Sequence, residues 1–458
     1  MLASFLLASM LAAGLSDCVP ARWPSAQPES LELLKGSPIN CLLLEESQWT
    51  AEFLGAARSR QLTVLAVIKP KQGDGLAKKA LSLSVDGLVL EGDPPREQVD
   101  SIRSLAREAG KPLVALLPRG KIALDGAAPV VGTWQGLWPG IKVDPGGAVK
   151  AAPTGAPWIE TNSGFLRFVR AAVQPGNAIW MANRPPEKLV LGPERYAQAI
   201  GDAQMCGARW VLSLDPSLAA SLLEGDAKAR DAWTRIKRFL AFYEEHKDLC
   251  LLPDWSGLGL VQDVDSGALY SGGFLDMLAP RHIPAFIAPT RKLAAAQFSD
   301  VRMLLNIDPA SLTPEQKEVV KNAARHGATV VNGPPGWKVA SAQGDAITFS
   351  GDQTQKIDDA WREINSLIGR RNFGVRVFGA PGVLSNLKAT PDRTKWALHL
   401  VNYSQHPVEA ITIYVAGKRK KVTLLTPQGD KPMETYDVDE GTGVEIAKFV
   451  DIGILLIE

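Results

Sequence analysis

Four acidic residues end or directly follow short apolar runs, where a strand would carry them to one edge of a sheet. Two carboxyl groups placed across a bond can hydrolyse a glycosidic linkage, because one donates a proton and the other attacks or activates water. We take Glu160 as the first catalytic candidate, with Asp215 or Glu91 as its partner. Glu45 is a candidate for substrate binding.

Glu160 stands between Ile159 and Thr161, with Trp158 and Asn162 on either side. An apolar ring beside a carboxyl group raises its pKa, which suits a general acid. Asn162 is then placed to hold a sugar hydroxyl. The alternative is a buried glutamate that is hydrogen-bonded to the next turn between strand and helix.

The other three acids each have a structural alternative. Asp215 precedes a proline, which is the pattern of a helix N-cap and needs no chemistry. Glu91 also fits a turn residue before the prolines that follow it. Glu45 fits the cap of the helical pattern that starts directly after it.

Aromatic and polar side chains near other strand ends are candidates for substrate binding. Trp134 and Trp138 lie on and after one apolar run, where an indole ring can stack on a sugar face. Their alternative is core packing under a long loop. Asn183 and Arg184 end another run and can bind hydroxyls or a planar acid. Their alternative is a loop anchored by the two prolines that follow.

These candidates belong to a series of apolar runs that alternate with helical patterns. Continuous apolar runs are typical of strands that are buried on both faces. Alternation with helices predicts parallel pairing, and eight units predict an α/β fold with an irregular (β/α)8 TIM-like barrel over residues 37–250. A Gly- and Pro-rich stretch, 136–156, interrupts the series and is expected to be a functional loop. The expected strands are Ile39–Glu45, Thr63–Lys69, Gly87–Gly92, Leu113–Arg119, Val130–Gln135, Pro157–Asn162, Ala178–Asn183 and Arg209–Asp215.

The rest of the chain predicts two smaller domains and a linker. Residues 251–338 alternate strand and helix patterns, which indicates a small flavodoxin-like α/β domain with a parallel sheet. Residues 339–373 are expected to form a linker with a helix. In residues 374–458 strands alternate with turns, and Ile411, Ile413 and Val415 alternate with polar or small residues. This period of two predicts a C-terminal antiparallel β-sandwich.

The first 16 residues have the pattern of an export signal. An apolar run, Phe5–Leu15, precedes the small residue Ser16, and its eleven residues are fewer than the roughly 20 that span a bilayer. We expect a signal peptide at 1–16, a Pro-rich leader at 17–36 and a periplasmic or extracellular protein with no membrane contact after cleavage. The alternative is a buried N-terminal helix, because no basic residue precedes the run.

Composition excludes several classes of function. The chain has 50 Lys and Arg against 49 Asp and Glu, a net charge of +1, which argues against nucleic acid or an anionic membrane as the main partner. The four Cys and five His show no metal-binding spacing, and no phosphate loop is present, so we expect neither metal nor cofactor. Twelve Trp are many for 458 residues and fit a surface that meets sugar rings.

Several segments carry a resemblance to known proteins. Ser299–Leu305, Leu312–Glu315 and Trp396–Ser404 resemble parts of the middle and last domains of glycoside hydrolases that include beta-galactosidases with an amidotransferase-like middle domain. Thr133–Gly140 and Ala156–Asn162 resemble segments of uncharacterised bacterial glycosidase-like proteins. The resemblance implies a carbohydrate substrate and, through the middle domain, a homo-oligomer. No Cys follows Cys250, so amidotransferase chemistry is not expected.

The catalytic pattern of that family does not transfer directly. The resemblance implies an Asn-Glu pair at the end of the fourth barrel strand and a Glu at the end of the seventh. Counted from Ile39, these strands end at Arg119 and Arg184, and neither end carries a carboxylate. We expect a glycoside hydrolase acting on a poly- or oligosaccharide through paired carboxylates. The alternative is a non-catalytic carbohydrate-binding or scaffold protein derived from a glycosidase barrel.

Overall fold

The chain folds into two compact units in the computed structural model, which describes residues 14–458 apart from 126–127, 140, 144–148, 152–160, 188, 270–273, 334–354, 356–358, 360–361, 363, 381 and 405. The barrel unit comprises Met1–Gly136, Val173–Tyr196 and Ala208–Glu244. The second unit comprises Leu137–Ala172, Ala197–Gly207 and Glu245–Glu458. Within the described residues, no helix is both long and apolar enough to cross a membrane.

The barrel unit contains eight parallel strands that close on themselves. Neighbours pair in the order β1-β2-β3-β4-β5-β6-β9-β10, and a parallel bridge between Ala21 and Leu212 joins the first strand to the last. The amide of Arg22 donates to the Leu212 carbonyl over 2.8 Å, and the Leu212 amide donates to Pro20 over 3.0 Å. The strands are β1 (Pro20–Arg22), β2 (Cys41–Leu44), β3 (Thr63–Ile68), β4 (Gly87–Glu91), β5 (Leu113–Leu117), β6 (Val130–Thr133), β9 (Ala178–Ala182) and β10 (Arg209–Val211).

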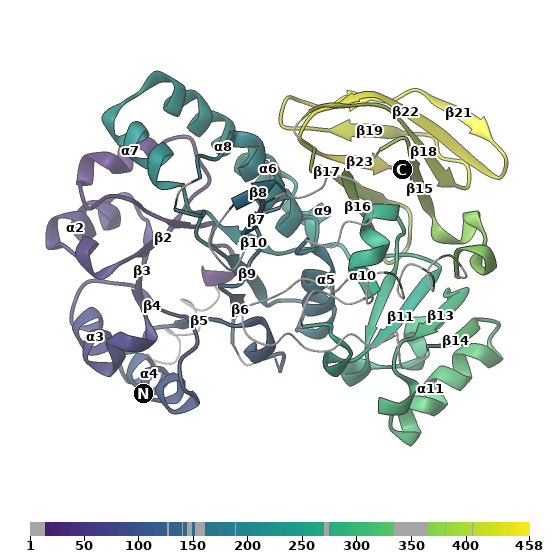
Figure 1. The fold of residues 1–458 in the computed structure, drawn as a ribbon, viewed down its shortest axis with the longest axis horizontal. Helices are drawn as coiled ribbons and strands as arrows, with labels where there is room; N and C mark the ends of the chain where they lie inside the picture. The colour runs from purple at the N-terminus through teal and green to yellow at the C-terminus, as the bar shows by residue number, and fades with distance from the viewer. Residues whose placement is uncertain are drawn as a thin grey trace. The chain divides into compact units, whose positions relative to one another are not determined.

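Helices cover the outer face of these strands (Figure 1). The helix after β3 shows why: Leu76, Ala77 and Ala80 are buried on one side, while its lysines face solvent. The α-helices of this unit are α2 (Ala51–Ser59), α3 (Gly73–Leu81), α4 (Arg96–Glu108), α7 (Pro216–Glu224) and α8 (Ala227–Glu245), and α6 (Pro193–Gln204) is divided between the two units. Short 3₁₀ turns are η1 (Pro28–Leu34), η2 (Glu46–Gln48), η3 (Pro70–Gln72) and η4 (Arg119–Lys121).

The expected barrel is confirmed, but its eight strands are not all those expected. Strand β6 pairs directly with β9, and most of the expected strand Pro157–Asn162 lies outside the described residues. The unexpected strand is β1, which lies in the segment expected to be a loose leader. Three residues give no periodic signal, and a proline is tolerated as the first residue of a strand. For both reasons, β1 could not be recognised in the sequence.

The second unit contains a four-stranded parallel sheet with the order β12-β11-β13-β14. This is the start of the flavodoxin-like order 2-1-3-4-5 and confirms the expected small α/β domain. Helix α11 (Pro314–Arg325) begins at the N-cap Thr313, whose side chain accepts from the Gln316 amide. The strands are β11 (Leu258–Gln262), β12 (Phe286–Pro289), β13 (Met303–Asn306) and β14 (Thr329–Asn332).

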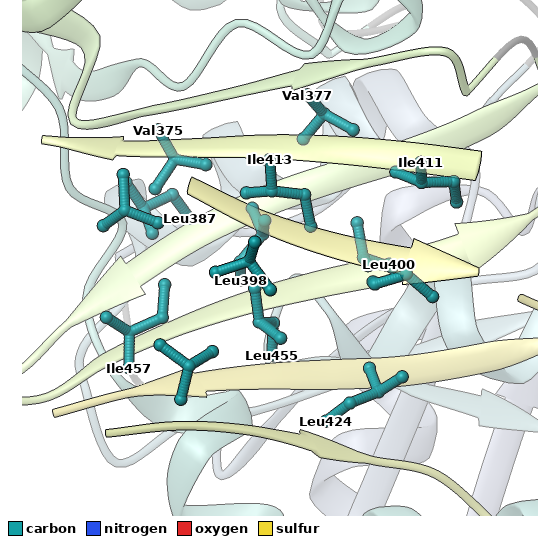
Figure 2. Close-up of a cluster of buried hydrophobic side chains, with 14 of the residues drawn as sticks. Val375, Val377, Leu387, Leu398, Leu400, Ile411, Ile413, Leu424, Leu455 and Ile457 are labelled. Atoms are coloured by element: carbon teal, nitrogen blue, oxygen red, sulfur yellow. The ribbon is translucent and has the colours of Figure 1, made fainter. Parts of the chain in front are cut away.

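The C-terminal residues of the second unit form two antiparallel sheets, as expected. Their facing side chains, among them Leu398, Ile413 and Leu455, form one hydrophobic core (Figure 2). One sheet has the order β15-β18-β22-β21 and the other β16-β17-β23-β19-β20. The strands are β15 (Val375–Phe378), β16 (Val383–Ala389), β17 (Trp396–Asn402), β18 (Val408–Ala416), β19 (Val422–Leu425), β20 (Lys431–Pro432), β21 (Thr435–Val438), β22 (Gly441–Phe449) and β23 (Ile452–Ile457).

The remaining elements of the second unit include two strands that the sequence did not predict. Strands β7 (Ile141–Val143) and β8 (Val149–Ala151) pair antiparallel within the stretch that was expected to be loop only. The other elements are α5 (Ser163–Ala172), α9 (Lys247–Leu251), α10 (Phe274–Leu278), η5 (Val264–Ser266), η6 (Ala279–Arg281), η7 (Thr290–Lys292), η8 (Ala295–Phe298), η9 (Pro309–Ser311) and η11 (Arg370–Phe373).

A buried charge network holds several of these elements together. Asp254 accepts from Arg167 Nε of α5 over 2.8 Å and lies 3.1 Å from Lys388 Nζ of β16, while Asn386 donates to it over 3.0 Å. The two cationic side chains are 3% and 1% exposed. Burial raises the pKa of Asp254, but the charges of Lys388 and Arg167 outweigh burial and lower it to about 2.

Two buried histidines predict loss of stability in mild acid. Burial lowers the pKa of His282 to about 4 and that of His399 to about 3, so both are neutral in the folded chain at pH 5. An unfolded histidine takes up a proton near pH 6.5. The stabilisation is therefore complete above pH 6.5 and is lost as the pH falls toward 4, by up to about 1.4 kcal/mol per pH unit for each residue.

Urea denaturation at pH 7, 5.5 and 4.5 measures this slope. His399→Gln should reduce it, whereas His326→Gln should leave it unchanged because His326 is exposed. A free energy of unfolding that is constant between pH 7 and 4.5 would contradict the expectation.

Candidate active site

The period of the barrel strands carries five charged side chains to one end of the barrel. Residues Leu43, Val67 and Val89 are buried in the barrel core, and the next residue on the same face lies two positions later. Two positions after these residues come Glu45, Lys69 and Glu91. The backbone of Glu45 and Lys69 is still extended, so their side chains keep to the same face. In the same way, Arg184 lies two positions after the core residue Ala182. Arg22 lies four positions, or two strand periods, after the core residue Cys18. The carboxyl ends of the strands form the face on which barrel enzymes build active sites.

These five residues form one connected cluster, which we call the barrel-mouth cluster. Arg22 Nη2 contacts Glu91 Oε1 over 2.5 Å, and Arg22 Nη1 lies 3.9 Å from Glu45 Oε1. Lys69 Nζ lies 3.2 Å from Glu45 Oε2, and Arg184 forms an ion pair with Glu45 Oε1. Side chains at the ends of β1 and β4, and from residues that follow β2, β3 and β9, thus form one network of charges.

Exposure increases across the cluster from its base to its rim. The side chains of Arg22 and Glu91 are 7% and 13% exposed, that of Glu45 is 29% exposed, and those of Lys69 and Arg184 are about half exposed. Burial lowers the pKa of Arg22, and the charge of Glu91 opposes this effect. The base is therefore a nearly dry ion pair, whereas the rim is open to water.

Several buried polar atoms at this end have no hydrogen-bond partner within the described part of the chain. They are Nε and Nη1 of Arg22, Oε2 of Glu91 and the indole Nε1 of Trp134. Buried polar groups in folded proteins are almost always paired, with protein atoms or with water. A guanidinium has five N–H donors and no acceptor, so Arg22 can donate further hydrogen bonds to a group from outside the chain, and Glu91 Oε2 can accept one.

Trp134 belongs to the same end of the barrel. It follows the buried Gly132 by two positions, is half buried and packs against the barrel core. The loop that follows it is anchored by Asn183, whose amide donates to the Gly136 carbonyl over 2.6 Å. Asn183, expected to bind substrate, thus also positions the loop beside Trp134.

Asp215 occupies the place of a helix cap. Its carboxylate is fully buried and accepts from the Leu218 amide over 2.9 Å and from the Tyr196 hydroxyl over 2.9 Å. The Leu191 amide donates to it as well, over 3.3 Å. These bonds use both carboxylate oxygens, so the geometry favours the capping alternative over the catalytic one, and we leave Asp215 out of the working pair.

Asn162 is also placed in a structural role, within the second unit. Its amide donates to the Leu137 carbonyl and accepts from the Leu137 amide, both over 2.8 Å, and the side chain is fully buried. The backbone N–H of Asn162 donates to the Asp202 carboxylate. Burial raises the pKa of Asp202 even though it accepts this hydrogen bond. The side chain of Asn162, which was expected to hold a sugar hydroxyl, is therefore engaged in hydrogen bonds within the chain.

Trp138 and Glu160 are the remaining predicted residues of the site. Trp138 is 4% exposed and lies in the second unit, so it is a buried side chain rather than an open stacking platform. Glu160 lies outside the described residues, and its role stays a prediction. In the part of the chain that the structure describes, no three His, Cys, Asp or Glu residues gather in a way that could hold a metal ion.

The correct strand count brings Glu91 closer to the family pattern. With β1 included, Glu91 ends the fourth strand, which is where the resemblance implies a catalytic carboxylate. The residue before it is Leu90 rather than Asn, and the seventh strand, β9, still ends without a carboxylate. Arg22 could not be recognised as a site residue from the sequence, because the three-residue strand β1 shows no period there. Lys69 could have been found, because it continues the alternation of Leu65 and Val67.

We predict that Arg22→Met destabilises the protein by about 3–5 kcal/mol, because it leaves the Glu91 carboxylate buried without its counter-charge. Arg96→Met is the control, since that side chain is 96% exposed and should change the free energy of unfolding by less than about 1 kcal/mol. Chemical denaturation measures both. Equal stability of the two variants would show that the Arg22–Glu91 pair is not buried in solution.

We predict that Asp215→Ala lowers the free energy of unfolding by about 0.5–2 kcal/mol, because the first turn of α7 loses its cap. Asp215→Asn should keep most of the stability, because Asn caps helices as well as Asp does. Thermal or urea denaturation of the two variants checks this difference. Equal destabilisation by Ala and Asn would contradict the capping role.

Comparison with known proteins supports the fold. No protein-family model matches the chain, and no curated protein matches it in sequence. An alpha-L-fucosidase isoenzyme 2 from Paenibacillus thiaminolyticus superposes over 96% of this chain and 98% of its own, with a TM-score of 0.62 and 11% identity. A rhamnosidase from Novosphingobium sp. PP1Y matches over 79% of this chain and 38% of its own, with a TM-score of 0.42 and 10% identity. The expected glycoside hydrolase-like architecture of this chain is therefore confirmed at the level of the fold.

Proposed function

We propose that the protein is a glycoside hydrolase that acts on an oligo- or polysaccharide at the carboxyl end of its barrel. The observation that carries this proposal is the convergence of Glu45 and Glu91 on the single guanidinium of Arg22. They come from β2 and β4, two strands that are not neighbours in the sheet. A fold alone does not assign an activity, so the proposal rests on these side chains.

The separation of the two carboxylates suits this reaction. Both contact the same guanidinium, at 2.5 Å and 3.9 Å, which keeps their nearest oxygens within the upper limit of about 9.5 Å for glycosidase carboxyl pairs. Glu91 is fixed at the buried base, and Glu45 is at the open rim. A sugar ring entering from solvent meets Glu45 first and Glu91 below it.

Each carboxylate is suited to one half of the reaction. Glu91, held by Arg22, is the carboxylate that faces the anomeric carbon, where it attacks or directs a water molecule. Glu45, at the water-exposed rim beside Lys69 and Arg184, takes up a proton from solvent and donates it to the leaving oxygen. The half-buried ring of Trp134 provides an apolar face on which a sugar can stack. Glu160 remains a further candidate for either role.

One feature favours the second candidate function, a non-catalytic carbohydrate-binding protein. Arg22 contacts both carboxylates, and Glu45 has three cationic neighbours. Carboxylates that only balance these cations would organise a binding site without transferring a proton. Removal of a single carboxylate charge should abolish turnover if the protein is a hydrolase. A binding protein would have no turnover to lose.

We predict that Glu91→Gln and Glu45→Gln each lower kcat by at least about 100-fold, because each removes one carboxylate from the chemistry. Purified protein is first screened with chromogenic glycosides and with plant and bacterial polysaccharides. Glu46→Gln is the matched control: this neighbouring carboxylate is exposed and pairs with Lys79 over 2.7 Å, outside the cluster. The control should keep wild-type turnover.

Two results would contradict the hydrolase. Wild-type kcat in Glu91→Gln with an intact fold would remove that residue from catalysis. Saccharide binding that is measurable by calorimetry, without any product from the panel, would instead support the binding protein.

A further inference from the structure

The barrel-mouth cluster carries an excess of one positive charge. Its three cations are Arg22, Lys69 and Arg184, and its two anions are Glu45 and Glu91. Glu45 is the neighbour of all three cations, whereas Glu91 forms an ion pair only with Arg22 within the cluster. One further anion would balance the charges of these five residues.

The cluster has unpaired hydrogen-bond donors on Arg22 and an unpaired acceptor on Glu91 among the described residues. Arg22 is more than nine-tenths buried and has two nitrogens, Nε and Nη1, without an acceptor among the described residues. Glu91 has one buried oxygen, Oε2, without a donor there. A ligand that completes the cluster must therefore offer both acceptors and a donor. The hydroxyl groups of a sugar offer both, and a carboxylate on the same ring adds the negative charge that balances the third cation.

We propose that the substrate is an acidic saccharide, such as a uronic acid unit, whose carboxylate binds the cations of the barrel mouth. This inference rests on the proposed function and adds the charge class of the sugar. Arg184 and Lys69, each about half exposed, meet the incoming carboxylate at the rim. Hydroxyl groups of the same ring donate to Glu91 at the base.

The arrangement of Glu45 indicates how the acid binds. Before a ligand arrives, Glu45 holds the position of the counter-ion to Lys69 and Arg184. An incoming carboxylate competes for the same two cations, and a planar guanidinium such as that of Arg184 can bind it through two hydrogen bonds. Exchange of these partners opens the way to Arg22 and releases Glu45 toward the glycosidic oxygen. A neutral sugar cannot make this exchange.

The test compares matched acidic and neutral substrates. We use p-nitrophenyl glucuronides and galacturonides against the corresponding glucosides and galactosides, in both anomeric forms. The wild type should show a kcat/KM at least about tenfold higher for the acidic member of the active pair. Arg184→Gln and Lys69→Gln should each lower the ratio of acidic to neutral kcat/KM by about tenfold.

Lys121→Gln is the matched control for these variants. Lys121 is an exposed cation that follows the fifth barrel strand, and it pairs with Asp93 over 2.5 Å, outside the cluster. Its replacement should leave the ratio of acidic to neutral kcat/KM unchanged. A fall in the ratio for Lys121→Gln equal to that for Arg184→Gln would mean that general surface charge sets the preference, and would overturn the inference.

A binding measurement separates this inference from the proposed function. Calorimetry with glucuronate and galacturonate oligomers, against neutral oligomers of equal length, does not depend on turnover. Acidic binding that is lost in Arg184→Gln, without hydrolysis of any substrate, would support the inference and reject the hydrolase. Turnover of neutral glycosides that is lost in Glu91→Gln, without preference for acidic ones, would support the hydrolase and overturn the inference.

Discussion

Closure of the barrel through β1 is the constraint on which the candidate site depends. The three residues of β1 pair with β2 on one side and meet Leu212 beyond β10 on the other. This closure places Arg22 at the mouth of the barrel, where its guanidinium meets Glu91. Removing a guanidinium from water costs several kcal/mol, and only a close opposite charge offsets that cost. Arg22 and Glu91 therefore constrain one another, and the other charges of the mouth are arranged around them.

The charge networks around Asp254 and at the barrel mouth differ in whether the hydrogen-bonding groups of their carboxylates are all paired among the described residues. Around Asp254 in the second unit, Arg167, Lys388 and Asn386 supply donors to both carboxylate oxygens, and the network holds helix and sheet together. At the barrel mouth, donors of Arg22 and an acceptor of Glu91 are left over within the described residues. A network with its carboxylate satisfied stabilises a fold, whereas one with spare bonding capacity beside an open rim is suited to a ligand.

The fold is supported by a solved structure, whereas the proposed activity is supported by the side chains at the barrel mouth. The likeness to an alpha-L-fucosidase extends over nearly the whole of both chains, and it concerns the arrangement of the elements. The hydrolase proposal depends on Glu45 and Glu91, and the choice of an acidic sugar depends on the surplus cation beside them. Export and assembly through the middle domain stay predictions from the sequence, as does the role of Glu160.

The barrel class, the parallel α/β sheet and the terminal sandwich could be predicted from the sequence, because the period of apolar residues reports which faces are buried, but the barrel strand β1 could not. The same period places Glu45 and Glu91 at strand ends. Only the tertiary structure decided which carboxylates meet: Asp215 caps a helix, and Arg22 enters from a strand too short to show a period. The physical reason is that register and closure depend on hydrogen bonds between distant strands, and these leave no local pattern in the chain.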